Sequence, residues 1–370
     1  MDLSVKESLE ALRGVLRAIR SSTPHTVFQF DRAASSDIRT GYIDGLPVRR
    51  LVITLRAPGC SWVERGGGCT MCGHLAGTTR GVLPSAEEFI SQFRRELALY
   101  DLRDIHVLSV YNSGSMLNPG ELGSEALKRI FLHIRTLPAV RKVVLETRAE
   151  YVDRASLEEL LDVLGPDQRL SIAMGLETAD DTKRDLCVNK GCTAGEIFHA
   201  VLKVKDIVGI QLYVLLGLPF LTEHEALDDT VRSLRYAHEM EADEIHIEPI
   251  TIQDNTLVDL LYHEGLFRLP SLYTLYEVLR TVVPEIRPYV SPFLHMPRPS
   301  LIPRGCPLCT DRLMDGLLKR YNISRERESL EYEPCACIPA WRERLRVTDE
   351  RPLAQRVQDS LAAVTDRVVS

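Results

Sequence analysis

The feature that most limits how this chain can fold is a regular alternation of strand-like and helix-like segments along most of its length. Six short apolar runs are separated by amphipathic runs with helical spacing. The apolar runs do not alternate with polar residues, which is typical of parallel strands covered on both faces. We therefore predict an α/β fold, a partial or full parallel barrel of six βα units. The expected strands are 51–55, 105–111, 142–147, 170–176, 210–216 and 244–250, and the expected helices are 86–99, 124–136, 156–164, 194–207, 224–240 and 272–282.

The segments that flank the barrel predict a division into five parts. We expect an N-terminal helix (3–20) with short strands at 25–30 and 38–43, and a hairpin turn at Asp44-Gly45. Six prolines between 284 and 303 indicate a linker rather than an element. The predicted boundaries are 1–46 for the N-terminal helix and strands, 47–283 for the barrel, 284–303 for the linker, 304–345 for a small cysteine-rich metal module and 346–370 for a charged tail.

Composition narrows the classes of function. Apolar residues make up 45% of the chain, and no apolar run is long enough to span a membrane, so we expect no membrane association. Nine cysteines in 370 residues favour metal ligation in a reducing cytoplasm over a disulfide framework. The formal net charge of −7 is not typical of a protein that binds nucleic acid by itself.

Three cysteines lie on one glycine-rich stretch, residues 58–74, directly after the first predicted barrel strand. Cys60, Cys69 and Cys72 are too few for a structural zinc site, which needs four protein ligands. They suffice to hold three irons of a [4Fe–4S] cluster and leave the fourth iron open. We expect this stretch to be irregular, because it is too rich in glycine for a helix or strand. The alternatives are three inert buried cysteines or part of a zinc knuckle.

This stretch resembles the cluster loop of radical S-adenosylmethionine (SAM) enzymes. The eight-residue gap between Cys60 and Cys69 is longer than the usual three and is similar to that of the elongator catalytic subunit. The wider phrase, from Ala57-Pro58-Gly59-Cys60 to Cys72-Gly73, most resembles the archaeosine-biosynthesis radical SAM proteins of archaea. The resemblance implies a [4Fe–4S] cluster and SAM as cofactors.

The resemblance also points to residues at the strand ends that would bind SAM. Asn112 and Ser113 follow the second predicted strand, where the superfamily binds the SAM amino group, although the usual Gly-Gly-Glu is absent. Glu146, at the end of the third predicted strand, is a further candidate for binding SAM. The alternative for Asn112 and Ser113 is a simple turn.

Two further predicted SAM ligands come from the next motifs along the chain. Glu177 lies in a run similar to the Gly-Leu-Glu-Ser/Thr of the superfamily, and Lys190 lies in Asn189-Lys190-Gly191, which resembles an Asn-Arg-Gly motif. Lys190 is our candidate for binding the SAM carboxylate. The alternative for the carboxylates is a rim ion pair, either Glu146 with Arg148 or Glu177 with Lys183.

A second cysteine group follows the prolines. The group comprises Cys306, Cys309, Cys335 and Cys337. Two close pairs of thiols fit a tetrahedral zinc site, and an auxiliary iron–sulfur cluster is the rival interpretation. We favour zinc because the pairs are compact.

The resemblance implies a tRNA substrate that carries a lysine-modified 7-deazaguanine. The enzyme would break the lysine side-chain carbon–nitrogen bond and leave archaeosine on the RNA. Two partners are implied. One is a lysine-transferring synthase that binds RNA, and the other is an electron donor. The alternatives are another radical SAM enzyme of RNA modification and a non-enzymatic scaffold with structural zinc at both cysteine groups.

Overall fold

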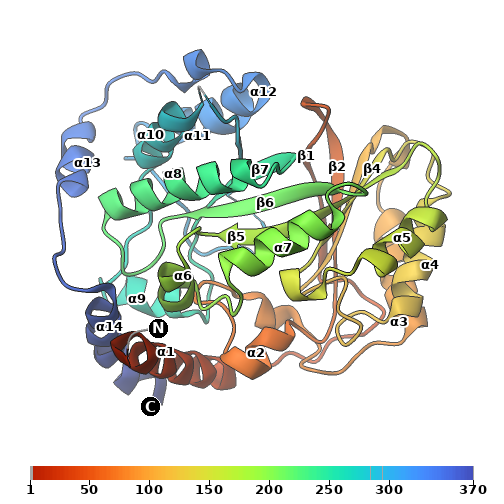
Figure 1. Cartoon of the computed structure of the whole chain (residues 1–370), viewed down its shortest axis with the longest axis horizontal. Helices are drawn as coiled ribbons and strands as arrows, with labels where there is room; N and C mark the ends of the chain where they lie inside the picture. Colours follow the sequence, from red (N-terminus) through yellow and green to blue (C-terminus); the bar gives the residue numbers. More distant parts are fainter. Residues whose placement is uncertain (1–2, 284, 294, 370) are drawn as a thin grey trace.

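One eight-stranded sheet forms the centre of the computed structural model, which describes residues 3–283, 285–293 and 295–369. The strands lie in chain order; β1 pairs antiparallel with β2, and every later pair is parallel. This topology confirms the predicted α/β fold as a partial parallel barrel (Figure 1). The strands are β1 (Ser35–Ile43), β2 (Leu46–Leu55), β3 (Val107–Asn112), β4 (Lys142–Glu146), β5 (Arg169–Glu177), β6 (Gly209–Leu216), β7 (Glu244–Pro249) and β8 (Tyr289–Val290).

Helices between the parallel strands form an outer layer around the sheet (Figure 1). Ser85, Thr193 and Thr222 each form a capping box with a glutamate three residues later, which explains where three of these helices start. The main apolar core lies between this layer and the sheet. The layer consists of α3 (Ala86–Leu97), α4 (Ser124–Ile134), α5 (Arg154–Val163), α7 (Ala194–Val204), α8 (Glu223–Glu239) and α10 (Leu272–Val282).

The two ends of the chain pack together next to the loop that follows β2. α1 (Leu3–Ser22), α9 (Leu257–His263) and α14 (Leu353–Val369) share a second apolar core. Figure 1 shows α1 and α14 side by side, and Ser8 Oγ lies 3.2 Å from the Ala354 carbonyl oxygen to which it donates. The predicted N-terminal helix is therefore present, the charged C-terminal tail is also helical, and both support the barrel.

The outer strands β1 and β8 approach each other through an aromatic stack. The ring centroids of Tyr42 and Tyr289 lie 3.8 Å apart. The Arg325 guanidinium covers the Tyr289 ring at 4.4 Å from its centroid. The hairpin of β1 and β2 therefore helps to enclose the barrel interior.

The predicted strand at 25–30 is wrong, because this segment has no regular structure. Side chains from other segments contact it instead. The Arg56 guanidinium lies 3.6 Å from the Phe28 ring centroid, and Gln92 Nε2 donates to the Phe30 carbonyl. Val27 is 88% exposed, so its side chain buries little of the apolar surface that would favour a strand at this position.

The predicted linker at 284–303 is mostly irregular over its described residues but is more than a linker. It contains β8, and Leu301 forms a bridge with Ile252. Pro292, His295 and Met296 line the barrel interior. This segment therefore contributes part of the wall of the site.

Short helices complete the described chain, and none of its helices has the length and apolarity of a membrane span. One of them, α2, corrects the expectation that residues 58–74 are wholly irregular. Gly67 ends α2 with a left-handed φ of 84°, and its N–H bonds back to the Val63 carbonyl. The short helices are α2 (Ser61–Gly66), α6 (Asp181–Lys183), α11 (Thr310–Asp315), α12 (Asn322–Ser324) and α13 (Ile338–Leu345), with π-helices at Arg184–Val188 and Gly316–Tyr321 and 3₁₀ turns at His74–Gly77, Leu102–Asp104, Ala149–Tyr151 and Arg327–Leu330.

Candidate active site

The cysteines of residues 58–74 lie together on the loop that follows β2, which we call the cluster loop. Cys60 precedes α2, and Cys69 and Cys72 follow it. The three thiols are close enough to influence one another electrostatically. Their sulfur atoms nevertheless do not all lie within 4.8 Å of one another. Among the described residues, the three thiols therefore do not form a compact site for a single metal ion. Three thiols suffice for three irons of a cluster.

Asn189 holds the glycine run of the cluster loop. Its side-chain amide donates to the carbonyls of Gly66 and Gly68 at 2.7 and 2.8 Å. Its own carbonyl accepts from the Trp62 indole N–H at 2.7 Å, and Arg13 Nε donates to its Oδ1 at 3.1 Å. The Asn-Lys-Gly motif therefore braces the loop through its first residue.

We predict that Asn189→Asp weakens retention of iron, because the carboxylate keeps the shape but cannot donate to two carbonyls. After anaerobic reconstitution, loss of iron to a chelator should be roughly tenfold faster than in the parent protein.

Asn322→Asp is the matched control. Asn322 is also buried and also holds backbone, since it bonds both the N–H and the carbonyl of Val290. This variant should lower the melting temperature without faster loss of iron. Equal iron loss in both variants would contradict the role assigned to Asn189.

Arg20 of α1 holds the cluster loop from the opposite end of the chain. Its Nε donates to the Gly67 carbonyl at 3.1 Å, and its Nη2 donates to the Cys69 carbonyl at 2.7 Å. It is 6% exposed. Sequence analysis missed Arg20, because nothing in the helix pattern separates it from Arg13 or Arg17.

Two cations lie near the thiols. Burial raises the pKa of the Cys60 and Cys69 thiols, whereas the positive charges of Arg148 and Lys190 lower it. Arg148 Nη2 donates to the Lys190 carbonyl at 2.9 Å, and its Nε pairs with Glu150 at 2.8 Å. Since iron binds thiolate rather than thiol, these cations favour the form of the cysteines that a cluster needs.

A cavity of about 320 Å³ lies inside the barrel, and Met71 and His74 of the cluster loop form part of its wall. Three carboxylates from β4, β5 and β7 also line it, namely Glu146, Glu177 and Glu248. Burial raises the pKa of Glu146 and of Glu248 to about 7. The strand ends therefore present a buried, acidic cavity beside the cluster loop, as expected for a parallel barrel.

Glu177 forms an ion pair with Lys190, at 2.6 Å between Oε1 and Nζ. Gly175 makes room for this pair, because a Cβ there would lie 2.0 Å from the Glu177 carboxylate and 2.5 Å from the Lys190 ammonium. Glu177 has a left-handed φ of 62°, a strained conformation of the kind that clusters at functional sites. The structure thus brings these two predicted residues together.

The alternative rim ion pairs proposed from the sequence are absent. Arg148 pairs with Glu150 rather than with Glu146, and Lys183 pairs with Asp229 rather than with Glu177. Asp229 is 2% exposed and reaches Lys183 at 2.8 Å, so Lys183 is held away from the cavity.

Asn112 and Ser113 lie where β3 ends, and the Asn112 side chain is engaged within its own turn. Its Oδ1 accepts from the Gly114 N–H at 3.0 Å, and its Nδ2 donates to the Ser115 carbonyl at 3.3 Å. Asn112 lines the cavity, whereas Ser113 is buried and does not appear in its wall. The turn interpretation therefore describes the Asn112 side chain, and binding of SAM by Asn112 and Ser113 stays a prediction.

Glu121 is a buried carboxylate that sequence analysis missed. Its Oε1 accepts from the Ser61 N–H at 2.8 Å and from Asn118 at 2.7 Å, and its Oε2 accepts from the Ser115 N–H at 2.5 Å. It thereby joins the cluster loop to the segment after β3. No local motif marks it, because its partner on the cluster loop, Ser61, is distant in sequence.

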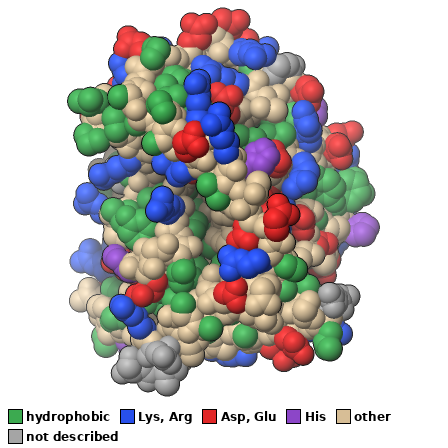
Figure 2. All heavy atoms as spheres, turned by 90° about the vertical axis from the view of Figure 1, so that its left-hand side faces the viewer, with side chains coloured by type: hydrophobic (Ala, Val, Ile, Leu, Met, Phe, Trp, Pro, Cys, Tyr) green, Lys and Arg blue, Asp and Glu red, His purple; other side chains and the backbone are tan. Residues whose placement is uncertain are grey.

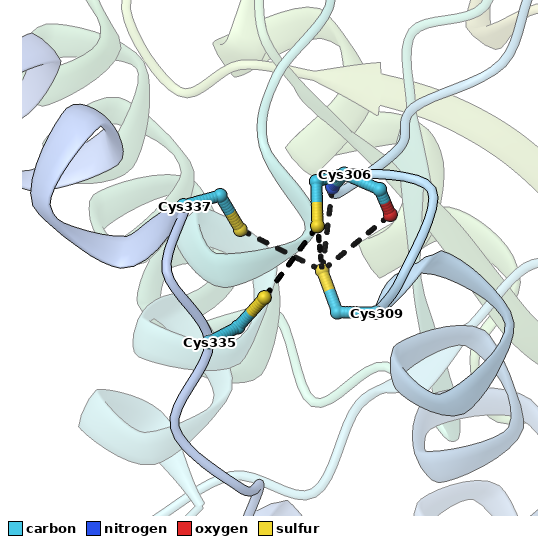
Figure 3. Close-up of side chains that lie close together, drawn as sticks. All are labelled: Cys306, Cys309, Cys335 and Cys337. Carbon is cyan, nitrogen blue, oxygen red and sulfur yellow. Dashed lines mark hydrogen bonds between the residues drawn. The ribbon is translucent and has the colours of Figure 1, made fainter.

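The four cysteines of the C-terminal group converge on one point (Figure 3). Their sulfur atoms all lie within 4.8 Å of one another. Cys306 lies 3.6 Å from Cys309 and 3.5 Å from Cys335, and Cys309 lies 3.7 Å from Cys337. Four thiolates at about 2.3 Å from one tetrahedral ion stand about 3.8 Å apart. The group therefore fits a single metal ion.

Comparison with known proteins shows relatives that match most of the chain. No protein-family model matches the chain. It is 29% identical to archaeosine synthase subunit beta of Methanosarcina acetivorans over 323 residues, which cover 85% of this chain and 90% of the relative. It is 28% identical to the protein of the same name from Thermococcus kodakarensis over 306 residues, covering 81% and 92%. The chain therefore resembles the archaeosine synthase beta subunits over most of its length.

Solved structures with a similar arrangement include other enzymes. Methylornithine synthase has a TM-score of 0.46 and 16% identity, and the match covers 77% of this chain and 71% of that one. A queuine lyase from Clostridium spiroforme has a TM-score of 0.43 and 18% identity over 62% and 90% of the two chains.

The cluster loop fits a [4Fe–4S] cluster by the chemistry of its donors. It offers three thiols and two nearby cations. Gly67 and Gly68 have left-handed φ angles of 84° and 77°, so the loop turns more tightly there than other residues allow. These features match a chain that wraps closely around an anionic cluster.

The raised pKa of Glu248 predicts a specific dependence of stability on pH. The folded carboxyl holds its proton up to about pH 7 instead of 4.5, so folding stability falls as pH rises between these values. Glu248→Gln removes this loss, which amounts to about 1–3 kcal/mol. The drop in melting temperature between pH 5 and pH 8 should therefore be about 2–5 °C smaller in the variant.

Glu7→Gln, at an exposed position of α1, is the control and should keep the parent drop. The test is a thermal melt of each metal-loaded protein at both pH values. An equal drop in Glu248→Gln and the parent would contradict the buried, protonated state of Glu248.

Proposed function

We propose that this protein is a radical SAM enzyme of tRNA modification that forms archaeosine. It breaks the side-chain carbon–nitrogen bond of a lysine attached to a 7-deazaguanine base, and the nitrogen stays on the base. The observation that carries this proposal is the similarity, over four fifths of the chain, to two proteins named archaeosine synthase subunit beta.

Cys60, Cys69 and Cys72 hold the [4Fe–4S] cluster in this proposal. When bound, the cluster and SAM together supply a 5′-deoxyadenosyl radical that removes a hydrogen atom from the substrate. The chain provides the surroundings: Asn189 and Arg20 fix the loop, and the barrel wall keeps water from the reacting atoms.

Glu177 and Lys190 bind the amino-acid end of SAM in this proposal. A carboxylate accepts from an ammonium and an ammonium donates to a carboxylate, so the pair offers both partners beside Cys69. Glu146 and Asn112 lie on the same cavity wall, and Ser113 is next to them in the chain. These three residues complete the proposed SAM site.

Zinc is the metal we propose for Cys306, Cys309, Cys335 and Cys337. The sulfur spacing of 3.5 to 3.7 Å supports one ion over an auxiliary cluster, whose thiolates bind separate irons and stand further apart. The ion would join the segment after the barrel to α10, because Cys337 Sγ lies 3.6 Å from the Tyr273 hydroxyl.

The partners in this proposal are tRNA, a lysine-transferring synthase and an electron donor. Lys/Arg and Asp/Glu side chains are interspersed on the face drawn in Figure 2, and no basic patch covers it. With a net charge of −7, the chain suits a division of labour in which the synthase supplies most RNA affinity.

The test is anaerobic. The protein is reconstituted with iron and sulfide, reduced with dithionite and given SAM together with tRNA that carries lysine-modified 7-deazaguanine. We expect 5′-deoxyadenosine and archaeosine in the digested RNA by mass spectrometry. Formation of 5′-deoxyadenosine without archaeosine, with the synthase also present, would overturn the proposed substrate.

A further inference from the structure

Arg50 is a buried cation on the inner face of the barrel, below the cluster loop. It lies on β2, is 9% exposed and lines the cavity. Its Nε donates to Ser109 Oγ at 2.7 Å, and its Nη2 donates to the Tyr111 hydroxyl. Arg50 stands five residues before the end of β2, roughly 16 Å of strand from the cluster loop.

Within the described chain, Arg50 forms no ion pair. Arg39, the other arginine of the cavity wall, does form one, with Asp37 at 2.6 Å. The hydrogen-bond partners of Arg50 are neutral hydroxyl groups. A buried guanidinium without a bound carboxylate is costly, so its place in a cavity wall calls for an anion there.

The carboxylates nearest to Arg50 do not fill this role. Glu244 acts on Arg50 electrostatically, but its oxygens are bonded to Lys142 and to His246. Glu146 also interacts with Arg50 at a distance, and burial raises its pKa to about 7.

A network of phenols fixes the position of Arg50. The Tyr111 and Tyr213 hydroxyls lie 3.2 Å apart, and Gln211 Nε2 donates to Tyr213 at 2.9 Å. The Arg50 guanidinium lies 5.8 Å from the centroid of the Tyr111 ring. These contacts come from β3 and β6 on the same inner face, so the charge is held in place before any ligand arrives.

We propose that Arg50 binds the carboxylate of the substrate's amino-acid group, with Glu248 as an acceptor for its ammonium. This proposal rests on the proposed function. A lysine joined to the base through its side-chain nitrogen leaves its α-carboxylate and α-ammonium free, and these two charges match the cation and the acidic wall of the cavity. Arg50 is thus a positioning residue that sets which side chain the enzyme accepts.

The test pairs two substrates with two variants. One tRNA carries lysine on the base, and the other carries 1,5-diaminopentane, which lacks only the carboxylate. The parent protein should favour the lysine form by roughly 30-fold or more in kcat/KM. Arg50→Met should lose this preference, so that both substrates react at similar rates, and Arg50→Lys should retain part of it.

Arg49→Met is the matched control, because Arg49 is the next residue of β2, lies on its outer face and is half exposed. It should keep the parent preference. Thermal melts verify that each variant folds. An unchanged preference in Arg50→Met would overturn the proposal. A raised KM for SAM in this variant, measured from 5′-deoxyadenosine formed without substrate, would also overturn it, because Arg50 would then bind SAM.

Failure of the proposed function gives a different result. The parent protein would then cleave SAM but leave both RNAs intact. Binding of free L-lysine and of free 1,5-diaminopentane, followed by NMR line broadening, tests Arg50 without the reaction. Preference for lysine that is lost in Arg50→Met supports the carboxylate site, and equal binding of the two ligands to the parent overturns it.

Discussion

Replacement of Cys69 by alanine is expected to lower the formation of 5′-deoxyadenosine by at least about 1,000-fold, to the level of protein without iron. Cys69 is one of only three thiols on the cluster loop, and each is expected to hold a different iron. Arg20 also donates a hydrogen bond to the Cys69 carbonyl, which holds the backbone of this residue in place. The measurement is 5′-deoxyadenosine by mass spectrometry after reduction with dithionite, together with the iron content.

Cys192→Ala is the control for this prediction. Cys192 is also a partly exposed free cysteine but lies outside the cluster loop. The control should bind iron and cleave SAM as the parent does. Full activity in Cys69→Ala, or equal loss in both variants, would show that the cluster loop does not hold the catalytic iron.

Replacement of Cys309 by alanine is expected to remove one bound metal ion and lower the melting temperature by about 5–10 °C. Binding of a structural zinc ion contributes directly to folding, and loss of one of four ligands forfeits most of that contribution. Cys309 is 1% exposed and packs against the main core, so the ion ties the C-terminal segment to the barrel. The measurements are metal content by mass spectrometry and a thermal melt.

Cys187→Ala gives the cost of removing a buried thiol without a metal, since Cys187 is fully buried and lies in the second core. It should lose no metal and melt within a few degrees of the parent. Removal of the ion from the parent by a chelator should reproduce the shift seen in Cys309→Ala. If Cys309→Ala keeps its metal content, the four cysteines do not form the site.

Sequence patterns anticipated the parts of the site that depend on neighbouring residues. The cluster loop, the strand-end carboxylates Glu146 and Glu177, and Lys190 were picked out because strand ends and loop motifs are local, and their roles stay predictions. The placement of the four C-terminal cysteines was anticipated because two close pairs suit one tetrahedral ion. The predicted strand at 25–30 failed because partners from other segments use its groups.

The sequence by itself determined the order of strands and helices, since apolar periodicity and helix caps act over a few residues. Only the tertiary structure decided which polar groups meet. Arg20 reaches the cluster loop from α1, Glu121 joins two loops, and Arg50 is left facing the cavity without a carboxylate. The physical reason is that a buried charge is defined by its partners, and these partners lie on segments that the fold alone brings together.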